Sequence, residues 1–323
     1  MPCARFPISG VFRPETARAA FCRAKGALRQ GVDNCRHLPL DLLKVRLILP
    51  AMSFRSLLAT LSILTLLLGK AAVAAPLSEP LKLSYDAYAG PFYVMSATVE
   101  LVLEDGRYRI VTNGKTEGFA AWMFSWTNQT VSEGTRENGM LTPSRHRVES
   151  HWGDKDRRVR LRYEDKRPVV EELLPGSDGG RRDSVPENLV ANTIDPLTMT
   201  ASLVLGMAKG GACQGDFRVF DGRRRYDLAV IHGVTDDLEE ESSSIYSGEA
   251  QSCSLRLNRI AGFWKKETKI AQPLQLPTLW MGRPGDNGPP VPVKFEAYSS
   301  YGTLRILLTR FEMGDEVVEL EKD

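Results

Sequence analysis

The feature that most constrains the fold is a two-residue alternation of apolar and polar side chains, interrupted by tight-turn dipeptides. Residues 92–104 alternate in this way, and one face of the segment carries Met95, Ala97, Val99, Leu101 and Leu103. Asp105-Gly106, Asn138-Gly139 and Asp221-Gly222 follow or separate such segments, and these dipeptides favour hairpins because they tolerate a positive φ. The pattern predicts an antiparallel meander, which protects its edge strands by curling or closing.

The same reading predicts strands over most of the remaining chain. They fall at residues 107–111, 129–137, 141–150, 157–163, 217–220, 226–231, 244–250, 253–259, 264–270, 291–299 and 302–311. Two helices interrupt them. We therefore expect a mainly β protein, with the meander forming a curved sheet or partly closed barrel and two short helices packed on or in it.

The first predicted helix is short and aromatic. Its apolar residues follow the i, i+3, i+4, i+7 spacing of one helical face, and they are Phe119, Trp122, Met123 and Trp126. The helix could pack as ordinary core, gate a half-open barrel or touch a lipid surface.

The second predicted helix covers residues 196–209. Asp195 is a good N-cap, Pro196 suits the first helical position, and Gly210-Gly211 end the helix. Its apolar stripe comprises Leu197, Ala201, Val204, Leu205 and Ala208.

Residues 52–74 have the pattern of a secretory signal peptide. Arg55 precedes an uncharged apolar run over residues 57–69, and Ala72-Val73-Ala74 offers a small-x-small cleavage site. We expect cleavage between Ala74 and Ala75. An uncleaved membrane anchor is the alternative, although the run is short of the roughly 20 residues that a span needs.

The N-terminal residues 1–51 are basic and lack apolar periodicity. A signal peptide does not normally work behind such a leader, so we expect translation to start at Met52 and residues 1–51 to be a mis-assigned upstream stretch that is not folded. Residues 75–323 would then form a single exported β-rich domain with no transmembrane span.

Charge and cysteine content narrow the function of that domain. Residues 75–323 hold 31 Lys and Arg against 37 Asp and Glu, a net charge of −6. Nucleic-acid binding is excluded because it needs a basic surface that neutralises phosphates. Cys213 and Cys253 are the cysteines left after cleavage, and two cysteines in an oxidising compartment usually form a disulfide. Two separate buried thiols are the alternative.

Familiar catalytic and cofactor motifs are missing from the sequence. It contains no Gly-x-Ser-x-Gly, His-Glu-x-x-His, phosphate-binding loop or Gly-x-Gly-x-x-Gly. His146 and His151 are five residues apart and would point to opposite faces of a strand, so we expect surface or capping histidines, no metal site and no cofactor. A pair of carboxylates that cleaves glycosides is still possible, but the spacing of the Asp and Glu residues does not single out any pair.

Three features are candidates for binding. The first is the aromatic helix with Phe119, Trp122, Met123 and Trp126. The second is the stripe formed by Arg158, Arg160 and Arg162, opposite Val159, Leu161 and Tyr163, which could hold anionic headgroups or envelope polysaccharide or be a solvated face balanced by Glu171 and Glu172. The third is Arg223-Arg224-Arg225, for which a charged hairpin tip is the alternative.

Three segments carry a family resemblance. They are Thr116-Glu117-Gly118-Phe119, Asp195-Pro196-Leu197, and Cys213 followed by Phe217-Arg218-Val219-Phe220-Asp221-Gly222-Arg223-Arg224-Arg225-Tyr226. Together they resemble the bacterial exported-protein family called "domain of unknown function 3108", over roughly residues 81–311. The resemblance implies a Gram-negative periplasm, an antiparallel β architecture, and the two cysteines on neighbouring strands. It implies no activity and no catalytic residue.

These observations favour a non-enzymatic periplasmic protein whose concave sheet binds an apolar or amphipathic envelope component, such as a lipid. An envelope assembly or scaffolding protein, which would contact another protein or a glycan, is the alternative. A polysaccharide hydrolase is the third hypothesis.

Overall fold

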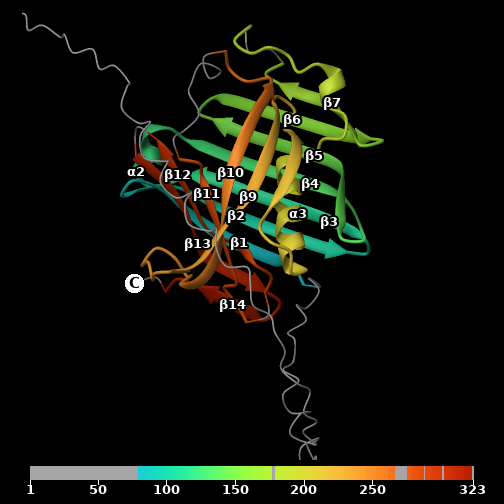
Figure 1. The fold of residues 1–323 in the computed structure, drawn as a ribbon. Helices are drawn as coiled ribbons and strands as arrows, with labels where there is room; N and C mark the ends of the chain where they lie inside the picture. The colour runs from blue at the N-terminus through green and yellow to red at the C-terminus, as the bar shows by residue number, and fades with distance from the viewer. Residues whose placement is uncertain (1–78, 177–178, 266–274, 287, 300–301, 322–323) are drawn as a thin grey trace, which may run out of the picture. The chain divides into compact units, whose positions relative to one another are not determined.

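The computed structural model describes residues 79–176, 179–265, 275–286, 288–299 and 302–321 (Figure 1). The expected leader 1–51, the signal peptide 52–74 and the cleavage site between Ala74 and Ala75 lie outside the described residues. All structural statements below concern the described part of the chain.

The described chain is mainly β. The strands are β1 (Leu81–Ala89), β2 (Phe92–Glu104), β3 (Arg107–Thr116), β4 (Trp126–Glu137), β5 (Met140–Trp152), β6 (Lys155–Glu164), β7 (Arg167–Leu174), β8 (Gly215–Phe220), β9 (Arg225–Leu238), β10 (Gly248–Ala261), β11 (Thr278–Gly282), β12 (Val291–Ser299), β13 (Gly302–Met313) and β14 (Glu316–Glu319). The helices are α2 (Gly118–Met123) and α3 (Pro196–Ala208), with a 3-10 turn at Glu187–Leu189.

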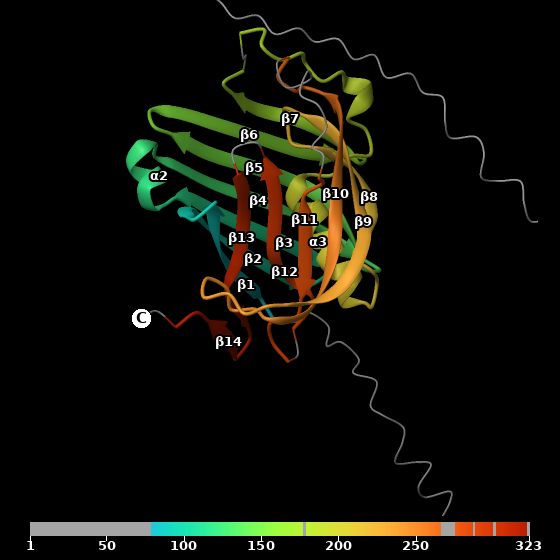
Figure 2. The same ribbon diagram turned by 60° about the vertical axis from the view of Figure 1, so that its left-hand side comes forward.

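All strands join one antiparallel sheet, in the order β7-β6-β5-β4-β3-β2-β1-β13-β12-β11-β10-β9-β8, and β14 pairs with β13. The chain first builds a meander from β1 out to β7. It then crosses through α3 and builds β8 to β13, which returns to pair with β1. The strong curvature of this sheet is visible in Figures 1 and 2. The predicted fold class, a curved and partly closed antiparallel sheet with two helices, is confirmed.

The hairpin dipeptides have the backbone that their residue types predict. Asp105 and Gly106 have φ values of 45° and 71°, and Asn138 and Gly139 have 51° and 80°. Two successive positive φ values are the signature of a type I′ turn, whose twist matches that of the flanking strands. These turns set the registers of β2 with β3 and of β4 with β5.

The chain segment before α3 covers the seam between the two ends of the sheet. Ile194 pairs in parallel with Val219 of β8, donating from its backbone N–H to the Arg218 carbonyl at 2.9 Å. Val190 packs in one cluster with Leu161 of β6 and Phe220 of β8. The exposed edge of β8 is therefore partly paired, and the sheet is close to a closed barrel.

Helix α3 lies inside the curve of the sheet, between the green strands β3 to β5 and the orange strands β8 to β10 (Figures 1 and 2). One side, with Ala201 and Leu205, packs on the cluster of β1, β2, β3 and β13. The other side, with Leu203 and Met207, packs on the cluster that contains β9, β10 and β11. Two sides of α3 are therefore buried, whereas Thr200 and Gly206 stay exposed, so the predicted single stripe understated the burial of the helix.

The disulfide between Cys213 and Cys253 is present, with a Cα–Cα distance of 5.9 Å. Cys253 lies in β10, whereas Cys213 lies in the loop between α3 and β8. The expectation of neighbouring strands is therefore wrong for Cys213. The bond instead ties the end of α3 to the sheet, and both cysteines are fully buried.

Several predicted boundaries differ from the structure. Residues 244–250 and 253–259 were expected as two strands, but β10 is continuous from Gly248, with a bulge between Gln251 and Cys253. Trp264 forms an isolated bridge with Arg182, and residues 266–270 lie outside the described residues. The sequence pattern did not predict β1, β7, β11 and β14. None of the described helices is both long and apolar enough to span a membrane.

Candidate functional site

The inner face of β1, β2 and β3 encloses an apolar cavity against α3, β12 and β13. The cavity has a volume of about 320 Å³, and its lining residues are Leu81, Leu83, Tyr85, Ala87, Met95, Ala97, Val99, Leu101, Ile110, Thr112, Leu197, Thr200, Ala201, Val204, Leu279, Pro292, Lys294, Phe295 and Ile306. The alternation in β2 predicted that Met95, Ala97, Val99 and Leu101 share a face, and this face lines the cavity. Lys294 is the one charged residue among these lining residues.

Two glutamates that do not line the cavity form ion pairs with Lys294 and neutralise its charge. Its Nζ lies 2.5 Å from Glu241 Oε1 and 3.5 Å from Glu296 Oε1, and Glu241 also pairs with Arg305 at 2.8 Å. Tyr85 donates its hydroxyl to the Pro292 carbonyl at 2.9 Å, and burial raises the pKa of this tyrosine. The Lys294 ammonium and the Tyr85 hydroxyl therefore already have partners in the protein, which leaves a mainly apolar surface for an occupant.

A second cavity, of about 490 Å³, lies on the inner face of β4, β5 and β6. Its polar and aromatic lining residues are Trp126, Asn128, Thr130, His146, Ser150, Arg157, Arg182, Asp221, Arg223, Arg224 and Trp264, together with Val148, Val159, Pro196 and Leu197. Leu197 lines both cavities. We call the first the apolar cavity and the second the polar cavity.

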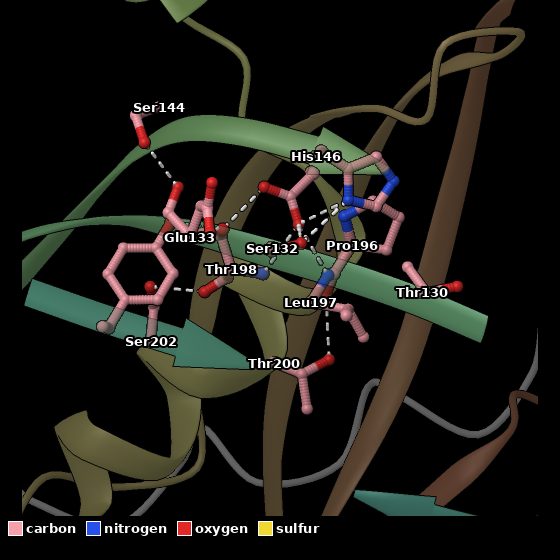
Figure 3. A network of polar contacts seen from close by, with 12 residues as sticks. Thr130, Ser132, Glu133, Ser144, His146, Pro196, Leu197, Thr198, Thr200 and Ser202 are labelled. Atoms are coloured by element: carbon pink, nitrogen blue, oxygen red, sulfur yellow. Dashed lines mark hydrogen bonds and ion pairs between the residues drawn. The ribbon is translucent and has the colours of Figure 1, made fainter. Parts of the chain in front are cut away.

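A buried hydrogen-bond network joins the polar cavity to the start of α3 (Figure 3). Asp195 caps the helix by accepting from the backbone N–H groups of Leu197 and Thr198, both at 3.0 Å. Its other oxygen accepts from the Thr198 hydroxyl at 2.6 Å. Ser132 donates to Asp195 at 2.6 Å, and the Nδ1 of His146 lies 2.8 Å from the Ser132 Oγ. The predicted N-cap is confirmed.

The proton positions in this network follow from the inventory of donors. Burial by itself would raise the pKa of Asp195, but the hydrogen bonds and charge of His146, with bonds from Ser132 and Thr198, hold that pKa below its ordinary value. The carboxylate therefore only accepts. Because the single hydroxyl proton of Ser132 goes to Asp195, its oxygen must accept from His146, and Nδ1 carries a proton.

The network resembles a serine–histidine–aspartate set in composition but not in geometry. A nucleophilic triad has the serine on one imidazole nitrogen and the carboxylate on the other. Here Ser132 and Asp195 both lie near the same Nδ1, at 2.8 and 3.3 Å. Ser132 is also fully buried. The arrangement caps a helix and orients His146; it does not activate Ser132.

His146 was expected at the surface or at a cap, and this expectation is wrong. The residue is 1 % exposed on the inner face of β5, whereas His151, five residues on, is exposed on the other face. Opposite orientation was predicted correctly from the spacing. Its ion-pair partner Asp195 is 49 residues away in the sequence, so no local pattern could reveal their contact. No group of three His, Cys, Asp or Glu side chains in the described residues is placed to hold a metal ion.

The stripe of Arg158, Arg160 and Arg162 lies on the outer face of β6, as predicted, with Val159 and Leu161 buried behind it. Glu172 pairs with Arg158 at 3.2 Å and with Arg160 at 3.0 Å. Arg162 pairs with Glu171 at 2.6 Å and also with Glu164. The stripe is thus matched by acids on β7 and its turn, and such exposed pairs contribute little to stability.

The turn after β8 is more than a charged hairpin tip. Arg225 is 3 % exposed and donates to the Leu189 carbonyl at 3.0 Å. Arg223 donates to the carbonyls of Leu174 and Pro175 at 2.6 and 3.1 Å. Arg224 pairs with Asp221 at 2.7 Å. Arg223 therefore fastens the turn to the end of β7, and Arg225 fastens it to the segment that precedes α3, while Arg224 pairs within the turn.

The aromatic helix α2 is exposed. Phe119, Trp122 and Met123 are 61 %, 81 % and 61 % exposed, so packing as ordinary core is wrong for these side chains. Phe124 stacks on Trp152, with ring centroids 5.3 Å apart. Trp126 was expected on the same helical face, but it begins β4 and lines the polar cavity. We call Phe119, Trp122, Met123, Phe124 and Trp152 the aromatic patch.

Comparison with curated proteins finds no match. Among solved structures, the chain is similar to one titled "Crystal Structure of Beta-barrel-like Protein of Domain of Unknown Function DUF1849 from Brucella abortus", at 13 % sequence identity and a TM-score of 0.46. That similarity covers 74 % of this chain and 99 % of the other. A family profile described as "Protein of unknown function (DUF3108)" matches residues 84–309. The resemblance seen in the sequence is confirmed, and the chain belongs to the DUF3108 family.

Proposed function

We propose that this is an exported periplasmic protein that binds an apolar or amphipathic component of the cell envelope inside its curved sheet. The observation that carries the proposal is the apolar cavity, whose volume of about 320 Å³ falls within the range of roughly 300–1,000 Å³ of small-molecule sites. The signal-peptide pattern at residues 52–74 supports export.

The surroundings of the cavity favour a ligand with a hydrocarbon part. Most of its wall consists of Leu, Val, Ile, Ala, Met and Phe side chains from α3 and from strands far apart in the sequence, and the charge of Lys294 is neutralised by Glu241 and Glu296. Burying apolar ligand surface against such a wall is favourable by about 25 cal/mol per Å². A polar ligand would lose its hydration there without gaining partners.

A variant that fills the cavity should therefore weaken binding. Thr112 lines the apolar cavity on the inner face of β3, and Thr112→Phe makes the wall more apolar but the space smaller. We expect at least a tenfold loss of affinity for the neutral fluorophore N-phenyl-1-naphthylamine, which corresponds to about 1.4 kcal/mol. Fluorescence titration measures it, on protein purified without detergent from a periplasmic extract; an intact mass that begins at Ala75 tests export on the same sample.

The matched control is Asn113→Phe, which puts the same ring on the exposed face of the same strand. It should bind the fluorophore as the unchanged protein does. Val99→Ala, which enlarges the cavity, should keep binding or improve it. If Thr112→Phe folds and binds the fluorophore normally, or if the unchanged protein does not bind it, the proposal is wrong.

The aromatic patch favours a second candidate function, envelope assembly through a protein partner. Exposed aromatic clusters of this kind often mark interaction surfaces. Changing Phe119 and Trp122 together to Ser should abolish capture of a stoichiometric protein from crosslinked envelopes, because these two rings, 5.5 Å apart, are the most protruding part of the patch. The control is Met140→Ser, which removes another side chain that is 70 % exposed. Equal loss from both variants would contradict a specific role of the patch.

A further inference from the structure

The polar cavity has a basic lining. Arg157, Arg182, Arg223 and Arg224 contribute guanidinium groups, against Asp221 as the carboxylate among the described lining residues. Asp221 is already engaged, because it accepts from the Arg224 side chain and from the backbone N–H groups of Arg223 and Arg224. The lining therefore carries an excess of positive charge on an otherwise acidic domain.

Arg157 reaches this lining because of the same alternation that builds the sheet. On β6, residues 158, 160 and 162 face outward, whereas Arg157, Val159 and Leu161 face inward. The inner-face position separates Arg157 from the glutamates of β7 that neutralise the outer stripe. Across the cavity, the Arg182 guanidinium lies 3.9 Å from the centroid of the Trp264 ring, which fixes its plane.

His146 supplies the second, independent observation. Its Nδ1 is committed to Ser132 and Asp195, and its side chain is 2 % exposed. Its Nε2 is a buried polar atom with no hydrogen-bond partner among the described residues. His146 lines the polar cavity, and Figure 3 shows this nitrogen pointing away from the network that holds the other. A buried polar atom left without a partner costs stability, and a polar group in the cavity would remove that cost.

We propose that the polar cavity binds an oxyanion, of the phosphate or carboxylate type, between the arginine-lined wall and His146, whose Nε2 donates to the anion when the ring is paired with Asp195 as a cation that carries a proton on both nitrogens. Guanidinium groups match the planar, multidentate geometry of such anions. Because Leu197 lines both cavities, the anion can be the head of an amphipathic molecule whose hydrocarbon part occupies the apolar cavity. This last link rests on the proposed function; the oxyanion site itself does not.

Calorimetric titration with three probes tests the oxyanion site separately from its link to the apolar cavity. Dodecyl phosphate carries both parts, dodecan-1-ol carries the chain alone, and inorganic phosphate carries the anion alone. We expect dodecyl phosphate to bind at least tenfold more tightly than dodecan-1-ol, because its phosphate gains charge-assisted hydrogen bonds that the alcohol cannot make.

Two variants test the residues. His146→Asn keeps an N–H near the position of Nδ1, so that Ser132 and Asp195 retain a donor, and removes Nε2. Arg157→Gln removes one inward charge. Each should lower the affinity for dodecyl phosphate about tenfold and leave dodecan-1-ol binding unchanged. Arg160→Gln, on the outer face of the same strand, is the matched control and should change neither.

The outcomes distinguish the two proposals. Binding of inorganic phosphate that both cavity variants weaken supports the oxyanion site with a free anion as its ligand, even if dodecan-1-ol does not bind and the proposed function fails. Equal affinity for dodecyl phosphate and dodecan-1-ol, together with no binding of inorganic phosphate, overturns the oxyanion site and leaves the apolar cavity standing. Unchanged phosphate affinity in folded His146→Asn and Arg157→Gln proteins also overturns it.

Discussion

Asp195→Ala is expected to lower the free energy of unfolding by about 3–5 kcal/mol, the usual cost of removing one partner of a buried, hydrogen-bonded charge pair. Asp195 is fully buried, accepts five hydrogen bonds or ion-pair contacts, and joins β4, β5 and α3 through them. Its loss leaves the first turn of α3 uncapped and deprives Ser132 and His146 of their shared acceptor.

Chemical denaturation monitored by circular dichroism measures this change. Asp195→Asn is the matched variant, because asparagine caps helices about as well as aspartate but has no charge for His146. It should cost less than the alanine variant. Equal, small losses below about 1 kcal/mol in both variants would show that Asp195 is an ordinary cap and that the network adds nothing.

The same variants have a predictable pH dependence. The pKa of Asp195 is lower in the folded protein than its ordinary value of 3.8, so the unfolded chain binds its proton first as the pH falls. The stabilisation is fully present above that ordinary value and is lost as the pH falls through the lower folded value. Asp195→Asn should lack this component, so the difference in unfolding free energy from the unchanged protein should shrink over this acidic range. A constant difference there would contradict the assignment.

Removing the disulfide with Cys213→Ala and Cys253→Ala together is expected to cost about 3–4 kcal/mol in the loop-entropy model. The two cysteines are 40 residues apart in sequence, and the bond limits the freedom of the unfolded chain over that loop. In the folded protein it fastens the segment after α3 to β10, next to Leu203 and Met207 of the helix. The helix should therefore be the first part to loosen.

Denaturation with and without a reducing agent tests this prediction. The unchanged protein should lose stability on reduction, whereas the double variant should be insensitive to the reducing agent. Hydrogen exchange should show faster exchange in α3 than in β2 and β3, which the bond does not join. Retention of the full unfolding free energy after verified reduction would contradict the prediction.

Local patterns in the sequence were sufficient to predict most strands of the sheet and their turns. Alternation places apolar residues on one face whatever the strand is paired with, so the apolar faces of β2 and β6 were predicted correctly. Asp105-Gly106 and Asn138-Gly139 fixed their hairpins because Asp, Asn and Gly tolerate the two successive positive φ values of the turn. Asp195 was identified as an N-cap for the same local reason. β1 and β11 were missed, and the end of α2 was extended wrongly to Trp126, because short apolar segments do not distinguish helix from strand.

The candidate sites depended on contacts between distant segments. Thr112 and Lys294 line one cavity only because β13 returns to pair with β1, which brings β3 and β12 onto the same inner face. Arg157 and Arg182 meet in the polar cavity only because the chain folds back over the seam of the sheet. Alternation could show that Arg157 faces inward, but not what lies opposite.

The sequence by itself determined the alternation, the turns and the Asp195 cap, because each depends on residues close together in the chain, and three short segments were enough to indicate the family. The tertiary structure decided that α3 crosses the interior and that Cys213, in a loop, forms its disulfide with Cys253 of β10. It also decided that His146 lines a basic cavity. These depend on sheet curvature and on the pairing of strands more than 100 residues apart, such as β1 with β13. No local pattern encodes that geometry, because it is set by how all strands pack around the helix together.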